Sequence, residues 1–207
     1  MRPARGRPRR SGAASAESVA ATVRTKRAGQ SALLLLDAIA VLQREKIDYA
    51  VIGAFALSAH GIVRASTDVD VLLFTTPQHL TKLRTRFQRA GFGTELRHGE
   101  TDDPIPAMLI LSDAHNNHVD LLSGLRGMDP AIFSRTIEVP FMGANLRIVG
   151  REDFIAMECF AGGPQDILDA QSAYRSAQGP VDLDLLRRVA RRFGRDAADD
   201  LERVLAS

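Results

Sequence analysis

Residues 49–74, "YAVIGAFALSAHGIVRASTDVDVLLF", decide the fold. Two apolar runs in this stretch, "YAVI" and "VLLF", have the composition of buried strands. Asp68 and Asp70 interrupt the second run. Successive side chains of a strand point to opposite faces, so Asp68 and Asp70 share one face while Val69 and Val71 point into a core. The stretch predicts two strands joined by a short helix, with two carboxylates side by side.

The rest of the chain predicts helices and further strands around this stretch. Helical spacing marks residues 32–46 and the segment "TPQHLTKLRTRFQRAGF". The runs "TELRH", "AMLILSD" and "NHVDLLSG" are typical of strands, and so is a pair around "MGAN", which Pro140 places at a sheet edge. Four helical segments follow from Arg151. The expected fold class is α+β: a mixed β-sheet core flanked by helices (31–150), with a helical C-terminal region packed on it (151–207).

The first 30 residues differ in composition from the rest. They hold eight Arg and Lys residues and one Glu, which gives a formal charge of +7. Because the whole chain has a net charge of +2, residues 31–207 carry −5. They contain no aromatic side chain and cannot bury enough apolar surface to offset the entropy of ordering. We expect a disordered basic tail at residues 1–30. Nucleic-acid binding, an organellar transit peptide and a solvated extension are the alternatives for its role.

Hydropathy and cysteine content bear on location. No apolar run approaches the roughly 18 residues of a membrane span, and the longest, "ALLLLDAIAVL", contains Asp37. The single cysteine, Cys159, excludes an internal disulfide and suits a reducing compartment. We expect a cytoplasmic protein that does not bind membranes.

The candidate catalytic residues are Asp68, Asp70 and a third acid, Asp120 in "HVDLL". Two carboxylates held a few ångströms apart repel each other unless a cation lies between them. Oxygen-only donor sets favour Mg²⁺ or Mn²⁺. If the strand of Asp120 neighbours that of Asp70, three carboxylates converge, as in sites that hold two metal ions for phosphoryl or nucleotidyl transfer. We therefore predict that all three residues bind metal and act in catalysis.

The same stretch offers residues for the phosphates of a substrate. Gly53 ends one strand and begins a helix, so the backbone there can approach an anion closely, and Ala54 supplies a backbone N–H. Arg64 can donate two hydrogen bonds to a phosphate group. Thr67 carries a hydroxyl for a phosphate or a carboxylate. These four residues are the predicted substrate-binding set.

In this order, glycine, short helix, arginine, threonine and Asp-x-Asp, the residues resemble the first motif of a known superfamily. It is the nucleotidyltransferase superfamily with the DNA polymerase β-like fold, in particular its minimal and AbiEii-toxin-like branches. The resemblance covers about residues 45–175 and places the third carboxylate of the family at Asp120. "VGREDFIAMECFAGGPQDILDA" resembles a further helical segment of the AbiEii-like branch, in which Asp166 and Asp169 lie.

The resemblance implies an Mg²⁺-dependent enzyme that binds a nucleoside triphosphate such as ATP. Such an enzyme transfers the nucleoside monophosphate to an acceptor hydroxyl and releases pyrophosphate. The implied acceptors are the 3′ end of an RNA, tRNA among them, a protein hydroxyl or a small molecule. A toxin–antitoxin role, with a cognate antitoxin or toxin as partner, follows from the same resemblance.

The helical segment departs from the family at two positions. Where the family commonly carries a lysine and an arginine for the triphosphate, this chain has Glu158 and Gly163. Arg126 or Arg151 are candidate replacements. The alternative is a catalytically degenerate nucleotidyltransferase-fold module that binds or regulates. A metal-dependent phosphohydrolase would also use clustered aspartates, but it does not explain the order of glycine, helix and arginine.

Overall fold

The computed structural model describes residues 24–64 and 68–207. The predicted substrate-binding residue Thr67 and residues 1–23 of the predicted tail lie outside the described residues. The described part of the N-terminal segment, residues 24–30, contacts the helix and the turn beside it. Arg24 donates from its backbone N–H and from Nε to Asp37, at 2.7 and 2.6 Å, and the N–H of Gln30 donates to Asn117 Oδ1 at 2.6 Å.

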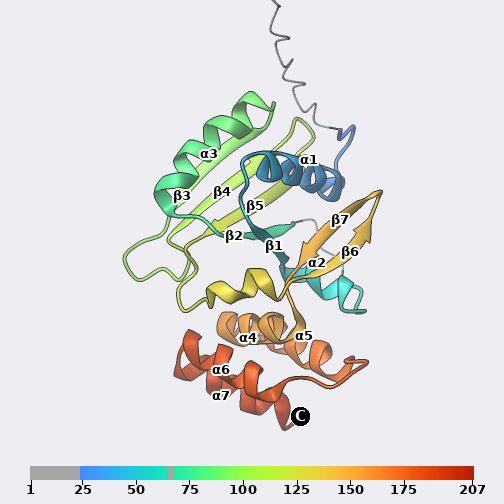
Figure 1. Ribbon diagram of the computed structural model, residues 1–207, viewed down its shortest axis with the longest axis vertical. Helices are drawn as coiled ribbons and strands as arrows, with labels where there is room; N and C mark the ends of the chain where they lie inside the picture. The colour runs from blue at the N-terminus through green and yellow to red at the C-terminus, as the bar shows by residue number, and fades with distance from the viewer. Residues whose placement is uncertain (1–23, 65–67) are drawn as a thin grey trace, which may run out of the picture.

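Seven strands of the described residues form one mixed sheet in the order β3-β4-β5-β2-β1-β7-β6 (Figure 1). The strands are β1 (Tyr49–Ile52), β2 (Asp70–Leu73), β3 (Gly93–His98), β4 (Ala107–Ser112), β5 (His118–Ser123), β6 (Ile137–Phe141) and β7 (Ala144–Ile148). β2 pairs with β1 antiparallel and with β5 parallel, and β7 joins β1 in parallel. Pro140 lies on the edge strand β6, as predicted, where a missing N–H leaves no ladder bond unmade.

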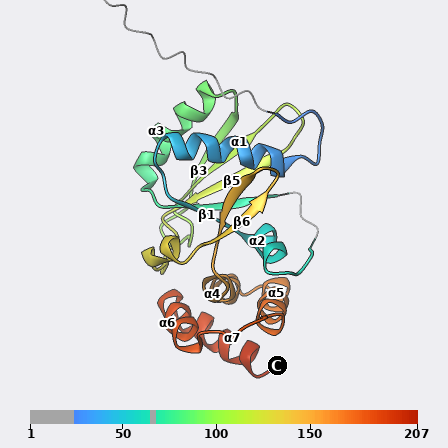
Figure 2. The ribbon, with the colours of Figure 1, turned by 45° about the vertical axis from the view of Figure 1, so that its right-hand side comes forward.

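Helices cover both faces of this sheet. They are α1 (Ser31–Arg44), α2 (Gly53–Ala59), α3 (Pro77–Arg89), α4 (Arg151–Ala161), α5 (Pro164–Arg175), α6 (Leu183–Phe193) and α7 (Arg195–Leu205). A 3₁₀ helix, η1 (Pro130–Ser134), was not predicted. α1 and α3 lie on one face, and α4 to α7 gather on the other side (Figures 1 and 2). The fold class is therefore α+β, as the sequence predicted.

None of the helices in residues 24–64 and 68–207 is long and apolar enough to cross a membrane.

Local sequence explains where α3 begins and which of its faces is buried. The Thr76 side chain accepts a hydrogen bond from the N–H of His79 at 3.2 Å, and Pro77 occupies the first helical turn. Leu80, Leu83 and Phe87 recur at helical spacing and are buried. This apolar stripe packs α3 onto β3 and β4.

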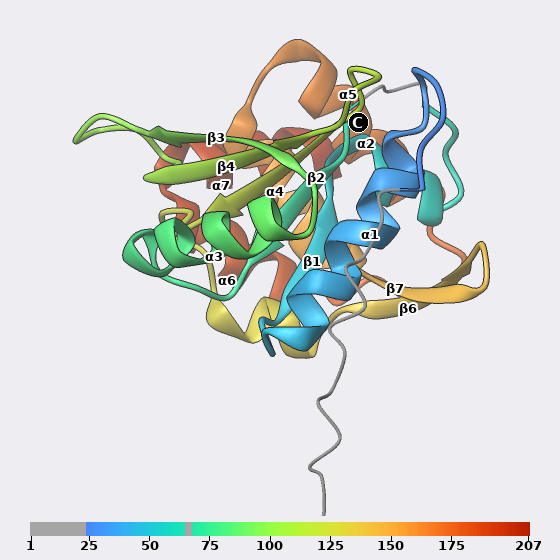
Figure 3. The ribbon, with the colours of Figure 1, turned by 90° about the horizontal axis from the view of Figure 1, so that it is seen from above.

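Alternation along β2 and β5 determines which face of the sheet carries polar groups. Val71 and Leu121 are fully buried on the face that α1 and α3 cover. Asp70 and Asp120 point to the opposite face, because strand side chains alternate. Seen from above, α4, α6 and α7 lie behind the strands on that opposite face (Figure 3). The two carboxylates consequently face the C-terminal helices.

Candidate active site

Asp70 and Asp120 lie directly opposite each other on paired parallel strands, in register as Cα partners. The N–H of Asp120 donates to the carbonyl oxygen of Val69 at 2.9 Å, so Asp68 and Asp70 flank the residue that holds Asp120 in place. The expectation that the strand of Asp120 neighbours that of Asp70 is confirmed. Two sequence segments about 50 residues apart thus bring carboxylates to one point on the sheet.

The carboxylates act on one another electrostatically. Burial raises the pKa of Asp70 to about 6, with further contributions from the negative charges of Asp120 and Asp68, while Arg64 acts in the opposite direction. Burial also raises the pKa of Asp120, and the charge of Asp68 adds to this effect. Negative charge is therefore concentrated where the strands meet, and a cation placed there would be favoured.

The donor chemistry of these three side chains fits a hard divalent cation. Asp68, Asp70 and Asp120 offer only carboxylate oxygens, which suit Mg²⁺ or Mn²⁺ better than Zn²⁺. Among residues 24–64 and 68–207, no three His, Cys, Asp or Glu side chains are already close enough to ligate one ion together. Side-chain rotation about fixed backbone positions would be needed to close a ligand shell on a metal. The register of the paired strands supplies the backbone positions of Asp70 and Asp120.

Gly53, the first residue of α2, lies against the Asp70 carboxylate. Its φ is +64°, in the left-handed region that favours glycine, and an added Cβ would stand 2.7 Å from Asp70 Oδ2. Ala54 follows in the first turn of α2 and is buried. The turn predicted to approach phosphates thus contacts one of the predicted metal-binding carboxylates.

Arg64 forms an ion pair with Asp169 of α5 through Nη1. The side chain of Asp169 is 7% exposed and that of Arg64 is 39% exposed. Gln165 Nε2 donates to the other carboxylate oxygen of Asp169 at 2.8 Å. The positive charge of Arg64 acts against the rise in the pKa values of Asp70 and Glu158.

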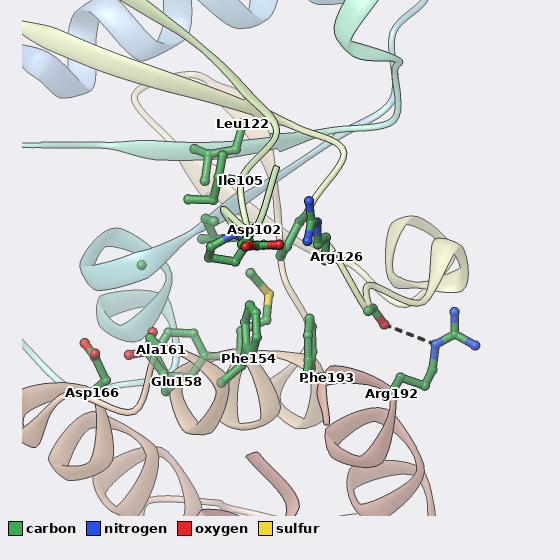
Figure 4. A pocket seen from close by; sticks show the side chains of 17 residues that line it. Asp102, Ile105, Leu122, Arg126, Phe154, Glu158, Ala161, Asp166, Arg192 and Phe193 are labelled. Carbon is green, nitrogen blue, oxygen red and sulfur yellow. Dashed lines mark hydrogen bonds between the residues drawn. The ribbon is translucent and has the colours of Figure 1, made fainter. Parts of the chain in front are cut away.

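A cavity of about 680 Å³ lies between the sheet and the C-terminal helices. Ile52 and Gly53 line it, so it begins beside Asp70. Leu122 of β5 faces it from the sheet, and Phe154 and Phe193 face it from the helices (Figure 4). This volume and this apolar lining with a few polar groups are typical of pockets for small organic ligands.

Charged side chains lie at both ends of the cavity, and Asp102 lies near Arg126 (Figure 4). Glu158 and Asp166 lie together at one end, and Arg126 and Arg192 lie toward the other (Figure 4). Burial, together with the negative charges of Asp166 and Asp169, raises the pKa of Glu158 to about 8. Arg192 donates to the carbonyl oxygens of Gly127 and Met128.

The two arginines predicted as replacement cations occupy different places. Arg126 lines the cavity and donates to the carbonyl oxygen of Thr101. Arg151 lies at the start of α4 and donates to the carbonyl oxygen of Ala173 at 2.5 Å and to Ser176 Oγ at 3.3 Å. A ligand bound in the cavity would therefore lie beside Arg126. Arg151 instead connects α4 to the end of α5.

Sequence reasoning missed the apolar wall of the cavity and the partner of Arg64. The wall on α4 consists of Phe154, Met157 and Ala161, which recur at helical spacing and line the cavity together. This spacing is a signal that reading the sequence could have used. No comparable signal links Arg64 to Asp169, because these residues are 105 positions apart.

No protein-family model matches the chain, and no curated protein matches its sequence. Among solved structures, it is similar to the antibiotic-resistance factor ANT(2″)-Ia, with a TM-score of 0.55 at 13% identity over 86% of this chain and 97% of that chain. It is similar to a nucleotidyltransferase candidate from Thermotoga maritima, with a TM-score of 0.53 at 14% identity over 74% and 98%. A nucleotidyltransferase-like protein from Paracoccidioides brasiliensis gives 0.50 at 14% identity over 85% and 91%. With strands, helices and carboxylates arranged as described, the chain has the nucleotidyltransferase fold.

Proposed function

We propose that this protein is a divalent-metal-dependent nucleotidyltransferase that transfers a nucleoside monophosphate from a nucleoside triphosphate to an acceptor hydroxyl. The observation that carries the proposal is the pairing of Asp70 with Asp120, in register on adjacent strands and beside a nucleotide-sized cavity. Asp68, two residues before Asp70, completes the proposed set of carboxylates. The nucleotidyltransferase fold supports the same reaction class.

The proposed metal ligands are Asp68, Asp70 and Asp120. A Mg²⁺ or Mn²⁺ ion held there would neutralise charge on the phosphates and polarise the α-phosphate. Asp120 is proposed to draw the proton from the acceptor hydroxyl. The acceptor oxygen then bonds to the α-phosphorus, the bond from that phosphorus to the oxygen bridging to the β-phosphate breaks, and pyrophosphate leaves.

The proposed phosphate-binding residues are Gly53, Ala54, Arg64 and Thr67. The backbone N–H groups of Gly53 and Ala54 in the first turn of α2 are the proposed donors to the phosphates, and the missing Cβ of Gly53 leaves room for the Asp70 carboxylate beside them. Arg64 carries five N–H donors, and the bond from Nη1 to Asp169 leaves donors for a phosphate oxygen. Thr67 stays a prediction from the sequence.

The nucleoside is proposed to lie in the apolar part of the cavity. Phe154 and Met157 of α4 and Leu122 of β5 supply flat or flexible apolar surface on two sides. A nucleobase stacks favourably on such side chains and leaves its polar edge for other groups. Arg126, which lines the same cavity, is a proposed cation for the bound nucleotide.

The acceptor is proposed as a class of molecules that carry a hydroxyl group. The solved complex of ANT(2″)-Ia contains adenylyl-2″-tobramycin, so in that protein the modified molecule is a small one. For this chain we propose an RNA 3′ end, tRNA included, a protein hydroxyl or a small molecule. The excess of positive charge in residues 1–30 favours RNA among these. A toxin–antitoxin role is proposed on the AbiEii-like resemblance alone.

A second candidate function is a degenerate nucleotidyltransferase-fold module that binds a ligand without transfer. Glu158 favours it, because a carboxylate at the acidic end of the cavity opposes the binding of a triphosphate when it is ionised. The raised pKa of Glu158, about 8, keeps the group largely neutral at pH 7 and reduces that opposition. This observation weighs toward the active enzyme.

Incubation with each α-³²P-labelled nucleoside triphosphate, Mg²⁺ or Mn²⁺, and an acceptor pool tests the proposal. The pools are total RNA, a protein extract and tobramycin. The proposal predicts label on one pool with the wild type and none with Asp70→Asn, whereas an exposed substitution on α7, Asp199→Asn, leaves transfer unchanged. Metal-dependent nucleotide binding without transfer to any pool would favour the degenerate module, and neither binding nor transfer would refute both.

A further inference from the structure

The ion pair between Arg64 and Asp169 joins two parts of the chain at the edge of the site. Arg64 lies between α2 and β2, five residues after the end of α2, and Asp169 lies in α5. The pair is asymmetric in exposure, since Asp169 is nearly buried at 7% and Arg64 is 39% exposed. A nearly buried carboxylate is costly unless its oxygens have partners, and here Arg64 pairs with one oxygen and Gln165 donates to the other.

Asp169 limits the positions that the Arg64 side chain can take. Arginine has a long and flexible side chain, and fixing one end of its planar guanidinium orders the whole group. Gln165, one turn earlier on α5, donates to the second oxygen of Asp169 and so fixes the carboxylate that receives Arg64. The guanidinium is thereby held from two sides, by its own backbone and by α5.

The position that results is next to the proposed reaction site. Asp169 lies one turn after Asp166 on α5, and Asp166 lines the cavity together with Gly53 and Glu158. The Arg64–Asp169 pair therefore lies near the acidic end of the cavity. The N–H donors of Arg64 that Asp169 does not occupy are available to phosphate oxygens.

We infer that Asp169 is a positioning residue for nucleotide binding, which holds the Arg64 guanidinium toward the phosphates of the bound triphosphate. The inference rests on the proposed function. It assigns to α5 a role in the site without direct contact with the substrate. The competing explanation is a structural one, in which the pair only attaches α5 to the loop after α2.

A matched control for the structural explanation exists in the same protein. Arg135 donates to both oxygens of Asp153 at 2.7 and 2.6 Å, and Asp153 is 1% exposed. This pair attaches the end of η1 to α4, and neither residue lines the cavity. Loss of the Arg135–Asp153 pair should lower stability and leave nucleotide affinity unchanged.

Isothermal titration calorimetry with ATP, GTP, CTP and UTP, each with MgCl₂, tests the inference, with the thermal midpoint Tm measured in parallel. Asp169→Asn should weaken binding of the preferred nucleotide about tenfold, because an Arg64 guanidinium that is no longer held in place loses its charge-assisted contact with the phosphates. Asp153→Asn should lower Tm and keep the wild-type Kd. The exchanged pair, Arg64→Asp with Asp169→Arg, should recover Tm and not affinity, because the guanidinium then extends from α5. Should Asp169→Asn fail to fold, Gln165→Leu, which removes the donor to the second oxygen of Asp169 and leaves Arg64 in place, should weaken binding in the same direction.

The outcomes separate the inference from the proposed function. Wild-type affinity in Asp169→Asn, or affinity restored by the exchanged pair, would overturn the positioning role and leave the nucleotidyltransferase proposal intact. Failure of the wild type to bind any of the four nucleotides would overturn both. A loss of affinity that the exchanged pair does not restore supports the positioning role.

Discussion

The Asp70 carboxylate rests on the Cα of Gly53, so closely that a Cβ at position 53 would stand 2.7 Å from Asp70 Oδ2. Two features require glycine at this position. Its φ is +64°, and the Asp70 carboxylate occupies the space that a Cβ would fill. A predicted phosphate-binding turn and a predicted metal ligand therefore depend on each other.

Gly53→Ala should abolish Mn²⁺ binding and lower Tm, because the methyl group displaces the Asp70 carboxylate and the backbone is strained at positive φ. The matched control is Gly61→Ala, where φ is +93° and no atom lies within 4 Å of the added Cβ. That variant should lose stability by about 1 kcal/mol through strain alone and keep Mn²⁺ binding. Electron paramagnetic resonance of free Mn²⁺ measures the difference. Equal Mn²⁺ binding in both variants would contradict the contact.

Asp70→Asn should stabilise the metal-free protein and remove its response to metal. Burial and the charges of Asp120 and Asp68 disfavour the ionised form of Asp70, so an amide of similar shape relieves them. We expect a gain on the order of 1 kcal/mol, or about 2–4 °C in Tm. Mn²⁺ should raise the Tm of the wild type and of Asp199→Asn, but not that of Asp70→Asn. A lower Tm for metal-free Asp70→Asn would show that Asp70 has a stabilising role instead.

Glu158 should make the protein less stable as pH rises. Its pKa is about 8 in the folded protein against an ordinary 4.5, so the folded state binds the extra proton between these values. Stability is then full below about pH 4.5 and declines as pH rises toward 8. In urea unfolding, Glu158→Gln should have the same free energy of unfolding as the wild type at pH 4.5. At pH 8.5 its free energy of unfolding should be higher by on the order of 2 kcal/mol. The exposed control Glu100→Gln should show no such difference, and a pH-independent difference for Glu158→Gln would contradict the assignment.

Glu158→Lys should tighten binding of a nucleoside triphosphate. The substitution places a cation at the acidic end of the cavity, beside Asp166 and near the Gly53 turn. We expect Kd to fall about tenfold with Mg²⁺ present, the effect of one charge-assisted contact. Calorimetry with the four nucleotides measures it. Unchanged or weaker binding would mean that the phosphates lie away from α4.

Strand periodicity made the sheet and its carboxylates predictable. Alternation in "TDVDVLL" and "HVDLL" assigns Asp70 and Asp120 to a polar face, and the paired register of β2 and β5 confirms that they are neighbours. The helices also follow from local signals, such as the Thr76 cap and the Pro77 start of α3. These features depend on residues close together in sequence, which is why sequence patterns reveal them.

The cavity and the partner of Arg64 could not be predicted in the same way. Arg126 reaches the cavity from the segment after β5, and Phe193 and Glu158 reach it from two helices. Their meeting is a result of how α4 and α6 pack beneath the sheet. The Arg64–Asp169 pair likewise depends on tertiary packing. The two residues are 105 positions apart, and the sequence alone does not show which of its many acidic residues an arginine will meet.

The position of the transferred phosphorus tests the central claim most directly. The wild type is incubated with Mg²⁺ and the acceptor pools, once with an α-³²P-labelled nucleoside triphosphate and once with the γ-³²P-labelled one. Nucleotidyl transfer predicts label on the acceptor from the α-phosphate only and release of the γ label as pyrophosphate, with both signals absent in Asp70→Asn. Transfer of the γ label, release of inorganic phosphate without transfer, or equal signals from wild type and Asp70→Asn would contradict a nucleotidyltransferase built on these carboxylates.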